Sequence, residues 1–512
     1  MIILMSFLLF IASIFGNKIL KLFAIICALA GGFYSFCVVK LNIYLTEEVA
    51  CDILGANNND ILFILTRWQV IPFTFLFGIL PAIIIYKIQI KDRKLTKGFI
   101  IKSLSRYAKA LTTFIVISLL VCTKSYKKKY FENIKKQTAP VSVLYPTKGM
   151  YRGYQHMLCV FFNVCNKREK LANYHIDKYT YTDNKQQEPV IGIFVIGESL
   201  RSDAISANGY KRKTTPFLEE AMKNSNPKNG KLFIYPNVLS CDILTESSVR
   251  CLMAKNLRDN WTEKKRIHHK AFSGIFTALN FDTYFYGLQH STITDKYMKK
   301  FYNAKNHIVR EDLQAIDGKT EGHYHDKYLI PHLNNKVKMN TIYVIHTDGN
   351  HQPYNTKYSK QQAQWGEETD RDEYDAATFA FDEFMQQLIE KFKDANAFIM
   401  YTSDHGESFG EINPNTNEET WFHGTMPRDI APEEQKRVPM IVWGSNKFIT
   451  NNKDKFQQLQ KIANNRYNIH FSHDNIWHSF LDCLNIKSDE IDKKLSICSS
   501  MFEIKKSQIQ TQ

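Results

Sequence analysis

Two short apolar runs of the sequence end directly in side chains that bind metal ions. Glu198 follows the run Ile191–Ile196 after one glycine, and Asp404-His405 follows the run Ala397–Thr402 after one serine. Carboxylates and imidazoles are ligand types suited to Zn²⁺, and less typically to Mn²⁺. Each site alone has an ordinary explanation, because an acid after a strand often begins a helix and most Asp-His pairs bind no metal. Together they predict one metal centre.

Two further histidines stand in glycine-containing loops, Gly349-Asn350-His351 and Phe422-His423-Gly424. A single loop histidine is usually just solvated. A strand-end Glu, a strand-end Asp-His and two loop histidines in one chain are much harder to obtain by chance. We therefore expect His351 and His423 to lie near the predicted metal centre.

A threonine between two cysteines is a candidate nucleophile. Thr245 stands in the pattern Cys241-x3-Thr245-x5-Cys251, in a turn rich in Ser and Thr. Taken alone, such a threonine is most simply a surface residue of the turn, and a free Thr hydroxyl is too weakly acidic to be an effective nucleophile at neutral pH. Coordination to a metal ion lowers the pKa of a hydroxyl and removes that objection.

The chain has ten cysteines, and six of them lie after residue 150 without forming a CxxC pair. An even set of this kind suits disulfide bonds in an oxidising compartment, and six cysteines allow fifteen connectivities. Pairing of Cys159 with Cys165, and of Cys483 with Cys498, is a guess.

The order and spacing of these motifs closely resemble those of the phosphoethanolamine transferases. That family belongs to the alkaline phosphatase and sulfatase superfamily and includes lipid A modifying and mobile colistin resistance enzymes. The matching segments are Gly197-Glu198-Ser199-x-Arg201-x-Asp203-x-x-Ser206-x-x-Gly209-Tyr210, Thr214-Thr215-Pro216, Cys241-x3-Thr245-x5-Cys251, His346-x-x-Gly349-x-His351-x-Pro353-Tyr354, Ser403-Asp404-His405-Gly406-Glu407-Ser408, His423-Gly424, Val438-Pro439-Met440 and Ser472-His473-Asp474-Asn475.

The resemblance implies a role for each matched residue. One zinc ion would activate the covalent nucleophile Thr245, and a second zinc ion is an option. Cys241 and Cys251 would form a disulfide that holds Thr245 on a rigid turn. The implied zinc ligands are Glu198, Thr245, Asp404 and His405, and the implied ligands of the donor phosphate or of a second zinc are His351 and His423.

The implied reaction moves phosphoethanolamine from phosphatidylethanolamine to a lipopolysaccharide acceptor, a lipid A phosphate or a core sugar, through a phospho-threonine intermediate. A glycerophosphate transferase or phosphohydrolase of the same superfamily is the alternative enzyme. An inactive membrane scaffold is the alternative outside enzymes, and bound metal would argue against it.

Some segments depart from the family pattern. The family usually has Cys-Gly-Thr before the nucleophile, where this chain has Cys241-Asp242-Ile243-Leu244. The family's Asn-rich, Lys-containing substrate segment is replaced by Gly287-Leu288-Gln289-His290-Ser291. Asn42 and Thr46 resemble lipid-site residues of the family, but the Glu expected four residues later is Ala50.

The elements that must position these residues alternate between two periodicities. Four compact apolar runs, at 191–196, 341–345, 397–402 and 438–443, read as buried strands, and the stripe from Phe381 to Phe392 has helical spacing. This alternation predicts an α/β domain with a mostly parallel central sheet, of alkaline phosphatase/sulfatase-like fold, whose ligands bind beyond the carboxyl ends of the strands. We place this catalytic domain at 188–505, after a linker with interfacial helices at 126–187.

The first 125 residues hold four uncharged runs, 1–17, 22–39, 68–86 and 110–123. They predict an α-helical transmembrane domain at 1–125. Loop 87–109 has eight Lys or Arg and one acid, so it should be cytoplasmic, which puts the catalytic domain in the periplasm of a bacterial inner membrane. The family typically has five membrane helices, so a first helix is missing from this count.

The formal net charge is +15, with basic residues scattered rather than gathered in a nucleic-acid-binding module. We therefore expect no nucleic-acid partner. The expected partners are phosphatidylethanolamine, a lipopolysaccharide or other envelope acceptor and membrane lipids, and the protein is expected to be a monomer.

Overall fold

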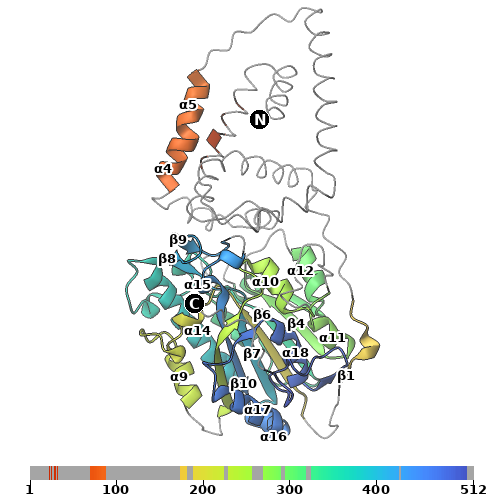
Figure 1. Ribbon diagram of the computed structural model, residues 1–512. Coiled ribbons are helices and arrows are strands. Elements are labelled where there is room, and N and C mark those ends of the chain that lie inside the picture. The colour runs from red at the N-terminus through yellow and green to blue at the C-terminus, as the bar shows by residue number, and fades with distance from the viewer. Residues whose placement is uncertain are drawn as a thin grey trace, which may run out of the picture. The chain divides into compact units, whose positions relative to one another are not determined.

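The computed structural model describes residues 70–87, 173–181, 188–223, 229–255, 269–289, 295–318, 324–425 and 428–503, with five single positions before residue 40 (Figure 1). Helix 70–87 belongs to one compact unit and residues 173–503 belong to another. The other predicted membrane runs, most of the linker, Asn42, Thr46, Cys159 and Cys165 lie outside the described residues.

One described helix is long and apolar enough to cross a membrane, and it covers the predicted run at 68–86. It consists of α4 (Val70–Thr74), the π-helical turn η1 (Phe75–Ile79) and α5 (Leu80–Lys87). Pro81 has no backbone N–H to continue the α-helical pattern, and the wider π turn directly precedes it. The N–H of Leu80 donates to the carbonyl of Phe75, five residues earlier, rather than to the carbonyl four residues earlier as in an α-helix.

In the described part of the chain, eight strands form one sheet in the order β11-β3-β10-β7-β2-β6-β4-β5. β10 pairs antiparallel with both neighbours, and every other pairing in this sheet is parallel, as the sequence predicts. The strands are β2 (Ile191–Gly197), β3 (Lys231–Leu239), β4 (Asp282–Gly287), β5 (Asn306–Val309), β6 (Thr341–His346), β7 (Ala397–Ser403), β10 (Arg437–Gly444) and β11 (Phe471–Ser472).

Helices cover both faces of this sheet, and two small pairs lie beside it (Figure 1). β1 (Thr180–Tyr181) pairs with β12 (Ile486–Lys487), and β8 (Ser408–Asn413) pairs with β9 (Glu418–Phe422). The helices are α9 (Pro216–Lys223), α10 (Thr245–Leu252), α11 (Ser273–Ala278), α12 (Asp295–Tyr302), α13 (Arg310–Asp317), α14 (Asp370–Phe392), α15 (Glu433–Lys436), α16 (Asn446–Asn451), α17 (Lys453–Ala463) and α18 (Asp474–Cys483).

Alternate residues of the central strands pack into two separate hydrophobic cores, one on each face of the sheet. Phe194 and Ile196 pack in the core that α11, α17 and α18 cover, whereas Ile193 and Val195 pack in the core that α9, α13 and α14 cover. The predicted stripe from Phe381 to Phe392 forms the buried face of α14. Each fully buried apolar side chain of this size stabilises the fold by about 1.5–3 kcal/mol. The sheet that carries the strand-end residues is therefore rigid.

The carboxyl end of α18 is held by a disulfide and by a half-buried lysine. Cys483 is bonded to Cys498, as guessed from the sequence. Lys455 of α17 donates its ammonium to the carbonyls of Asp482 (2.5 Å) and Cys483 (3.2 Å) and to Oδ1 of Asn485 (2.6 Å). The ammonium of Lys455 lies at the carboxyl end of α18, where the helix dipole is negative. It donates there to carbonyls of the last turn, which have no hydrogen-bond partner within the helix.

Replacing Lys455 with methionine should lower the free energy of unfolding by about 1–3 kcal/mol, because the carbonyl of Cys483 and Oδ1 of Asn485 lose a donor. The carbonyl of Asp482 loses the ammonium but keeps the N–H of Asn485. Burial lowers the pKa of Lys455 to about 8, so the folded state releases this proton at a lower pH than the unfolded chain does. Stability contributed by Lys455 therefore rises with pH above about 8, and the deficit of the variant should widen there.

Denaturant unfolding at several pH values measures both effects. Lys461→Met is the control, because Lys461 lies on the same helix but is exposed. A Lys455→Met variant as stable as this control would contradict the role given to Lys455.

Candidate metal centre and nucleophile

Glu198 and Asp404 leave the sheet side by side. β2 and β7 are parallel neighbours, and Gly197 is the register partner of Ser403. The N–H of Asp404 donates to the carbonyl of Gly197 at 3.0 Å, which continues the pairing one residue beyond the strand. The next residue of both strands thus points into the same space beyond their carboxyl ends, where parallel sheets bind ligands.

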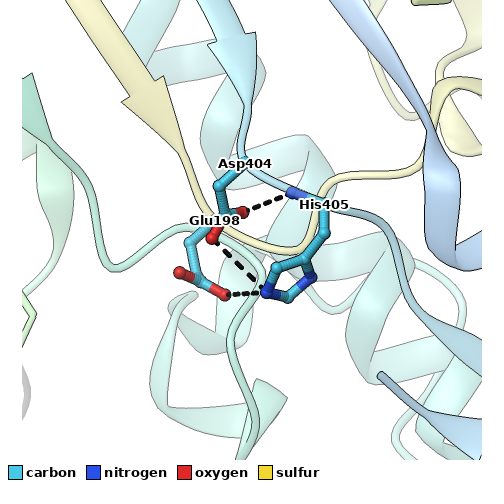
Figure 2. A group of neighbouring side chains, drawn as sticks. All are labelled: Glu198, Asp404 and His405. Atoms are coloured by element: carbon cyan, nitrogen blue, oxygen red, sulfur yellow. Dashed lines mark hydrogen bonds and ion pairs between the residues drawn. The ribbon is translucent and has the colours of Figure 1, made fainter. Parts of the chain in front are cut away.

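Figure 2 shows how closely Glu198, Asp404 and His405 approach one another. One ligand atom from each lies within 4.8 Å of the other two, and all three side chains are fully buried. Nε2 of His405 is 3.5 Å from Oε1 of Glu198 and 3.4 Å from Oδ2 of Asp404. The structure therefore brings together three of the predicted zinc ligands.

The hydrogen bonds around the three side chains leave ligand atoms facing the middle. Oδ1 of Asp404 accepts from the N–H groups of Ser199 (3.1 Å) and His405 (2.7 Å), whereas buried Oδ2 receives no hydrogen bond within the described residues. Nδ1 of His405 donates to the carbonyl of Gly406 at 2.9 Å. This tautomer turns the lone pair of Nε2 toward the carboxylates, as in histidines that bind metals.

The electrostatics of this group fit a cation. Burial raises the pKa of Asp404 to about 6. Burial, followed by the neighbouring His423, lowers the pKa of His405 to about 3, so the imidazole is neutral. Two buried carboxylates beside a neutral imidazole are costly without a positive charge between them. Two carboxylates, one imidazole and an orphaned Oδ2 suit a divalent ion such as zinc.

Thr245 lies at this group. Its Oγ1 is 3.2 Å from Nε2 of His405 and 3.3 Å from Oε2 of Glu198. The sequence suggested a turn at this position, whereas in the structure Thr245 is the first residue of helix α10. The partial positive charge at a helix start favours a negatively charged oxygen there. The disulfide Cys241–Cys251 ties the last turn of the helix back to the segment that precedes it.

The hairpin β8–β9 brings the second loop histidine to the site. Ser408 pairs with Phe422, so the flanking residues Glu407 and His423 face each other. Nδ1 of His423 donates to Oε2 of Glu407 at 3.2 Å, and the ring of His423 lies 4.3 Å from that of His405. Burial alone would lower the pKa of His423, but the Glu407 carboxylate outweighs it and raises the pKa to about 9. His423 is therefore a cation at neutral pH.

His351 approaches from the loop after β6. Its ring lies 6.0 Å from that of His423. The loop packs tightly behind Glu198: the N–H of Asn350 donates to the Glu198 carbonyl at 2.9 Å, and a Cβ on Gly349 would lie 2.9 Å from the same oxygen. Gly349 also has a left-handed φ of 47°. Only glycine fits there without displacing Glu198.

Three side chains at this site were not singled out as site residues from the sequence. Gln289, two residues after β4, donates its amide to Oε2 of Glu198. His346, at the end of β6, places Nε2 3.9 Å from the same oxygen. Glu407 orients His423. The sequence placed His346 at the end of a predicted strand and within a matched motif, without giving it a role. It placed Gln289 in the segment that replaces the family's substrate segment, but β4 was not predicted, so its contact with Glu198 was not either.

Comparisons with known proteins identify the family of this chain. A sulfatase family model matches residues 191–486, more than half of the chain, and a family model described as phosphoethanolamine transferase EptA/EptB matches residues 3–155. The Kdo(2)-lipid A phosphoethanolamine 7''-transferase of Escherichia coli (strain K12) is 28% identical over 330 residues, 61% of this chain and 54% of that protein. The chain thus spans about half the length of that relative.

Two solved structures share the fold. The integral membrane lipooligosaccharide phosphoethanolamine transferase A of Neisseria meningitidis superposes with a TM-score of 0.69 at 20% identity, covering 95% of this chain and 88% of that one. The periplasmic domain of Escherichia coli EptC, solved in complex with zinc, has a TM-score of 0.52 at 19% identity and covers 65% of this chain and 92% of that one. The chain thus belongs to the sulfatase family and, within the alkaline phosphatase and sulfatase superfamily, to the phosphoethanolamine transferases.

Proposed function

We propose that this protein transfers phosphoethanolamine from phosphatidylethanolamine to a lipopolysaccharide acceptor, a lipid A phosphate or a core sugar, through phospho-Thr245. The observation that carries the proposal is the position of the Thr245 hydroxyl, 3.2 Å from His405 and 3.3 Å from Glu198 at the start of a helix. A hydroxyl placed against a buried carboxylate and a buried imidazole in this way is suited to be a nucleophile.

Glu198, Asp404 and His405, together with Thr245 itself, would hold a zinc ion. When bound, zinc lowers the pKa of the Thr245 hydroxyl and offsets negative charge on the phosphoryl oxygens. The zinc in the related EptC domain supports this choice of metal over manganese. His351 and His423 stand next to the group and would bind the donor phosphate. The protonated form of His423 suits a phosphate, whereas a second zinc would require its neutral imidazole.

The chain's own residues account for the two halves of the reaction. Oγ1 of Thr245 bonds to phosphorus while the bond from phosphorus to the glycerol oxygen breaks, and diacylglycerol leaves with a proton. The cationic imidazole of His423 offsets the negative charge on the phosphoryl oxygens. An acceptor oxygen then replaces Oγ1 on phosphorus and passes its proton on, which restores the Thr245 hydroxyl.

Both lipid substrates reside in membranes, and the proposed location follows from that. The helix Val70–Lys87 and the match of residues 3–155 to the transferase family support a multi-pass protein of the bacterial inner membrane. We place the catalytic domain in the periplasm, where its two disulfides would persist. Asn42 and Thr46 would contact lipid, and the protein would act as a monomer.

Purified wild-type protein should contain about one tightly held zinc ion, as a site with four ligands does. Asp404→Asn should lose most of it, because the variant removes one of two ligand charges. Elemental analysis of the full-length protein measures both. A wild type that holds no metal and works in the presence of a chelator would contradict the zinc site.

Glu407→Gln should lower the rate of transfer by about 10–100-fold, because the residues that orient active-site groups typically contribute that much. Zinc content should stay at the wild-type level, since Glu407 touches none of the proposed ligands of the first zinc. Rate and metal are measured on the same preparation. Glu419→Gln, on the exposed side of the same hairpin, is the matched control. Equal rates for both variants would show that Glu407 does not act through His423.

Thr245→Ala should lower the rate of transfer by several orders of magnitude, because the variant lacks the oxygen atom that would carry the intermediate. The fold should survive, since the loss of one half-buried hydroxyl at a helix start usually changes stability by only about 1 kcal/mol. Thr245→Ser keeps a hydroxyl and should retain measurable activity. Wild type incubated with phosphatidylethanolamine and no acceptor should gain one phosphoethanolamine mass on the peptide that contains Thr245. An active alanine variant, or a mass on another peptide, would overturn the mechanism.

A further inference from the structure

The nucleophile and the metal-binding residues arrive from strands that are not neighbours. Thr245 follows β3, whereas Asp404 and His405 follow β7, and the antiparallel strand β10 lies between those two strands. No ladder of backbone hydrogen bonds therefore sets the distance from Oγ1 of Thr245 to the metal-binding group. Something else has to join the two segments.

His473 lies between the two segments and contacts both. It follows β11, directly before α18, and is buried. Its Nδ1 accepts the N–H of Cys241, at the start of the nucleophile segment, at 3.0 Å. Its Nε2 donates to the carbonyl of Ser403, the residue before Asp404, also at 3.0 Å. The imidazole thus links the end of β3 to the end of β7.

The hydrogen bonds of His473 require one tautomer. A backbone N–H can only donate and a carbonyl can only accept, so Nδ1 is unprotonated and Nε2 carries the proton. In this form the ring acts as a spacer of fixed length between two main-chain groups. Both groups are buried, so neither could exchange its partner for water without cost.

Ser248 makes a second link in the same place. Its hydroxyl, on the first turn of α10, donates to the carbonyl of Asp404 at 2.5 Å and lies 3.4 Å from Nδ1 of His473. Ser248 is fully buried, and α10 packs against α18. The two links therefore hold the helix that begins with Thr245 against the chain that carries Asp404 and His405.

We propose that His473 is a positioning residue, which with Ser248 sets the distance between the nucleophile and the metal-binding group. It touches no reacting atom, and its rate effect rests on the proposed role of Thr245. A displacement of about 1 Å in such a site lowers the rate by about 10²-fold. A histidine that served stability alone would give no such effect on the chemical step.

The test compares His473→Ala with His478→Ala in the full-length protein. His478 lies on α18, is also buried and also accepts a backbone N–H at Nδ1, from Asp492 at 3.0 Å. Both variants remove a buried imidazole with such a contact, so both should lose stability. Only His473→Ala should speed hydrogen exchange of the amides between Cys241 and Cys251, a readout that needs no enzymatic activity.

The rate readout is the formation of phosphoethanolamine-Thr245 at saturating phosphatidylethanolamine, below the unfolding temperature of every variant. His473→Ala should lower it about 10–100-fold with KM nearly unchanged, whereas His478→Ala should match wild type. His473→Asn can accept from Cys241 but not reach Ser403, and His473→Gln can reach Ser403 but not replace Nδ1, so neither should restore the rate.

The proposal would be overturned if amide hydrogen exchange between Cys241 and Cys251 in His473→Ala matched wild type. It would also be overturned if His473→Asn or His473→Gln, which each keep one of the two hydrogen bonds, reacted at the full rate. If wild type forms no adduct, the proposed function fails, but the exchange comparison still decides whether His473 links the two segments.

Discussion

The parallel pairing of β2 with β7 determines where the charges of this site lie. Gly197 and Ser403 are register partners, so the two strands release Glu198 and Asp404 at the same level, into the same buried space. Like charges at this spacing repel, and burial makes the repulsion stronger than it would be in water. His405 adds no positive charge, because its imidazole is neutral. A divalent cation between the two carboxylates would offset this repulsion.

The order of the sheet imposes a second requirement. β10 separates β3 from β7 and runs antiparallel to both. The segment Cys241–Cys251, which carries Thr245, therefore crosses the end of β10 to reach Asp404 and His405. A disulfide, a short helix and the side-chain contacts of Ser248 and His473 replace the ladder that neighbouring strands would provide. This explains why the segment from Cys241 to Cys251 combines a covalent link with buried polar contacts within so few residues.

The sequence predicted the middle of the sheet and missed its margins for a physical reason. The four apolar runs correspond to β10, β7, β2 and β6, which are contiguous and covered on both faces, so their residues are apolar without alternation. In β3, Pro236 and Asn237 divide the apolar residues into two short pieces at the point where the register with β10 shifts, whereas Pro439 stands near the start of the run that became β10. β4 is rich in aromatic and polar residues, and β5 has only four residues.

The same limit applies to the site. Glu198, Asp404 and His405 could be predicted because each directly follows a predicted strand. Gln289 was missed as a contact because its strand was missed. His473 stands in a matched motif, but the motif did not indicate its role, since its two partners are main-chain groups that the fold brings together from positions far apart in the chain.

The two neighbouring imidazoles of the site show how one fold gives the same side chain two different properties. The rings of His405 and His423 are 4.3 Å apart, yet the pKa of one is lowered to about 3 and that of the other is raised to about 9. The Nδ1–H of His405 donates a hydrogen bond to a neutral carbonyl, and burial is the main cause of its lowered pKa. The Nδ1–H of His423 donates to the carboxylate of Glu407, which raises its pKa. Separation of the pKa values of adjacent groups assigns different roles to them. His405 is suited to coordinate a metal, and His423 is suited to offset charge on a phosphoryl group. The hairpin β8–β9 begins just after His405 and ends just before His423, so it is the element that keeps the two histidines together.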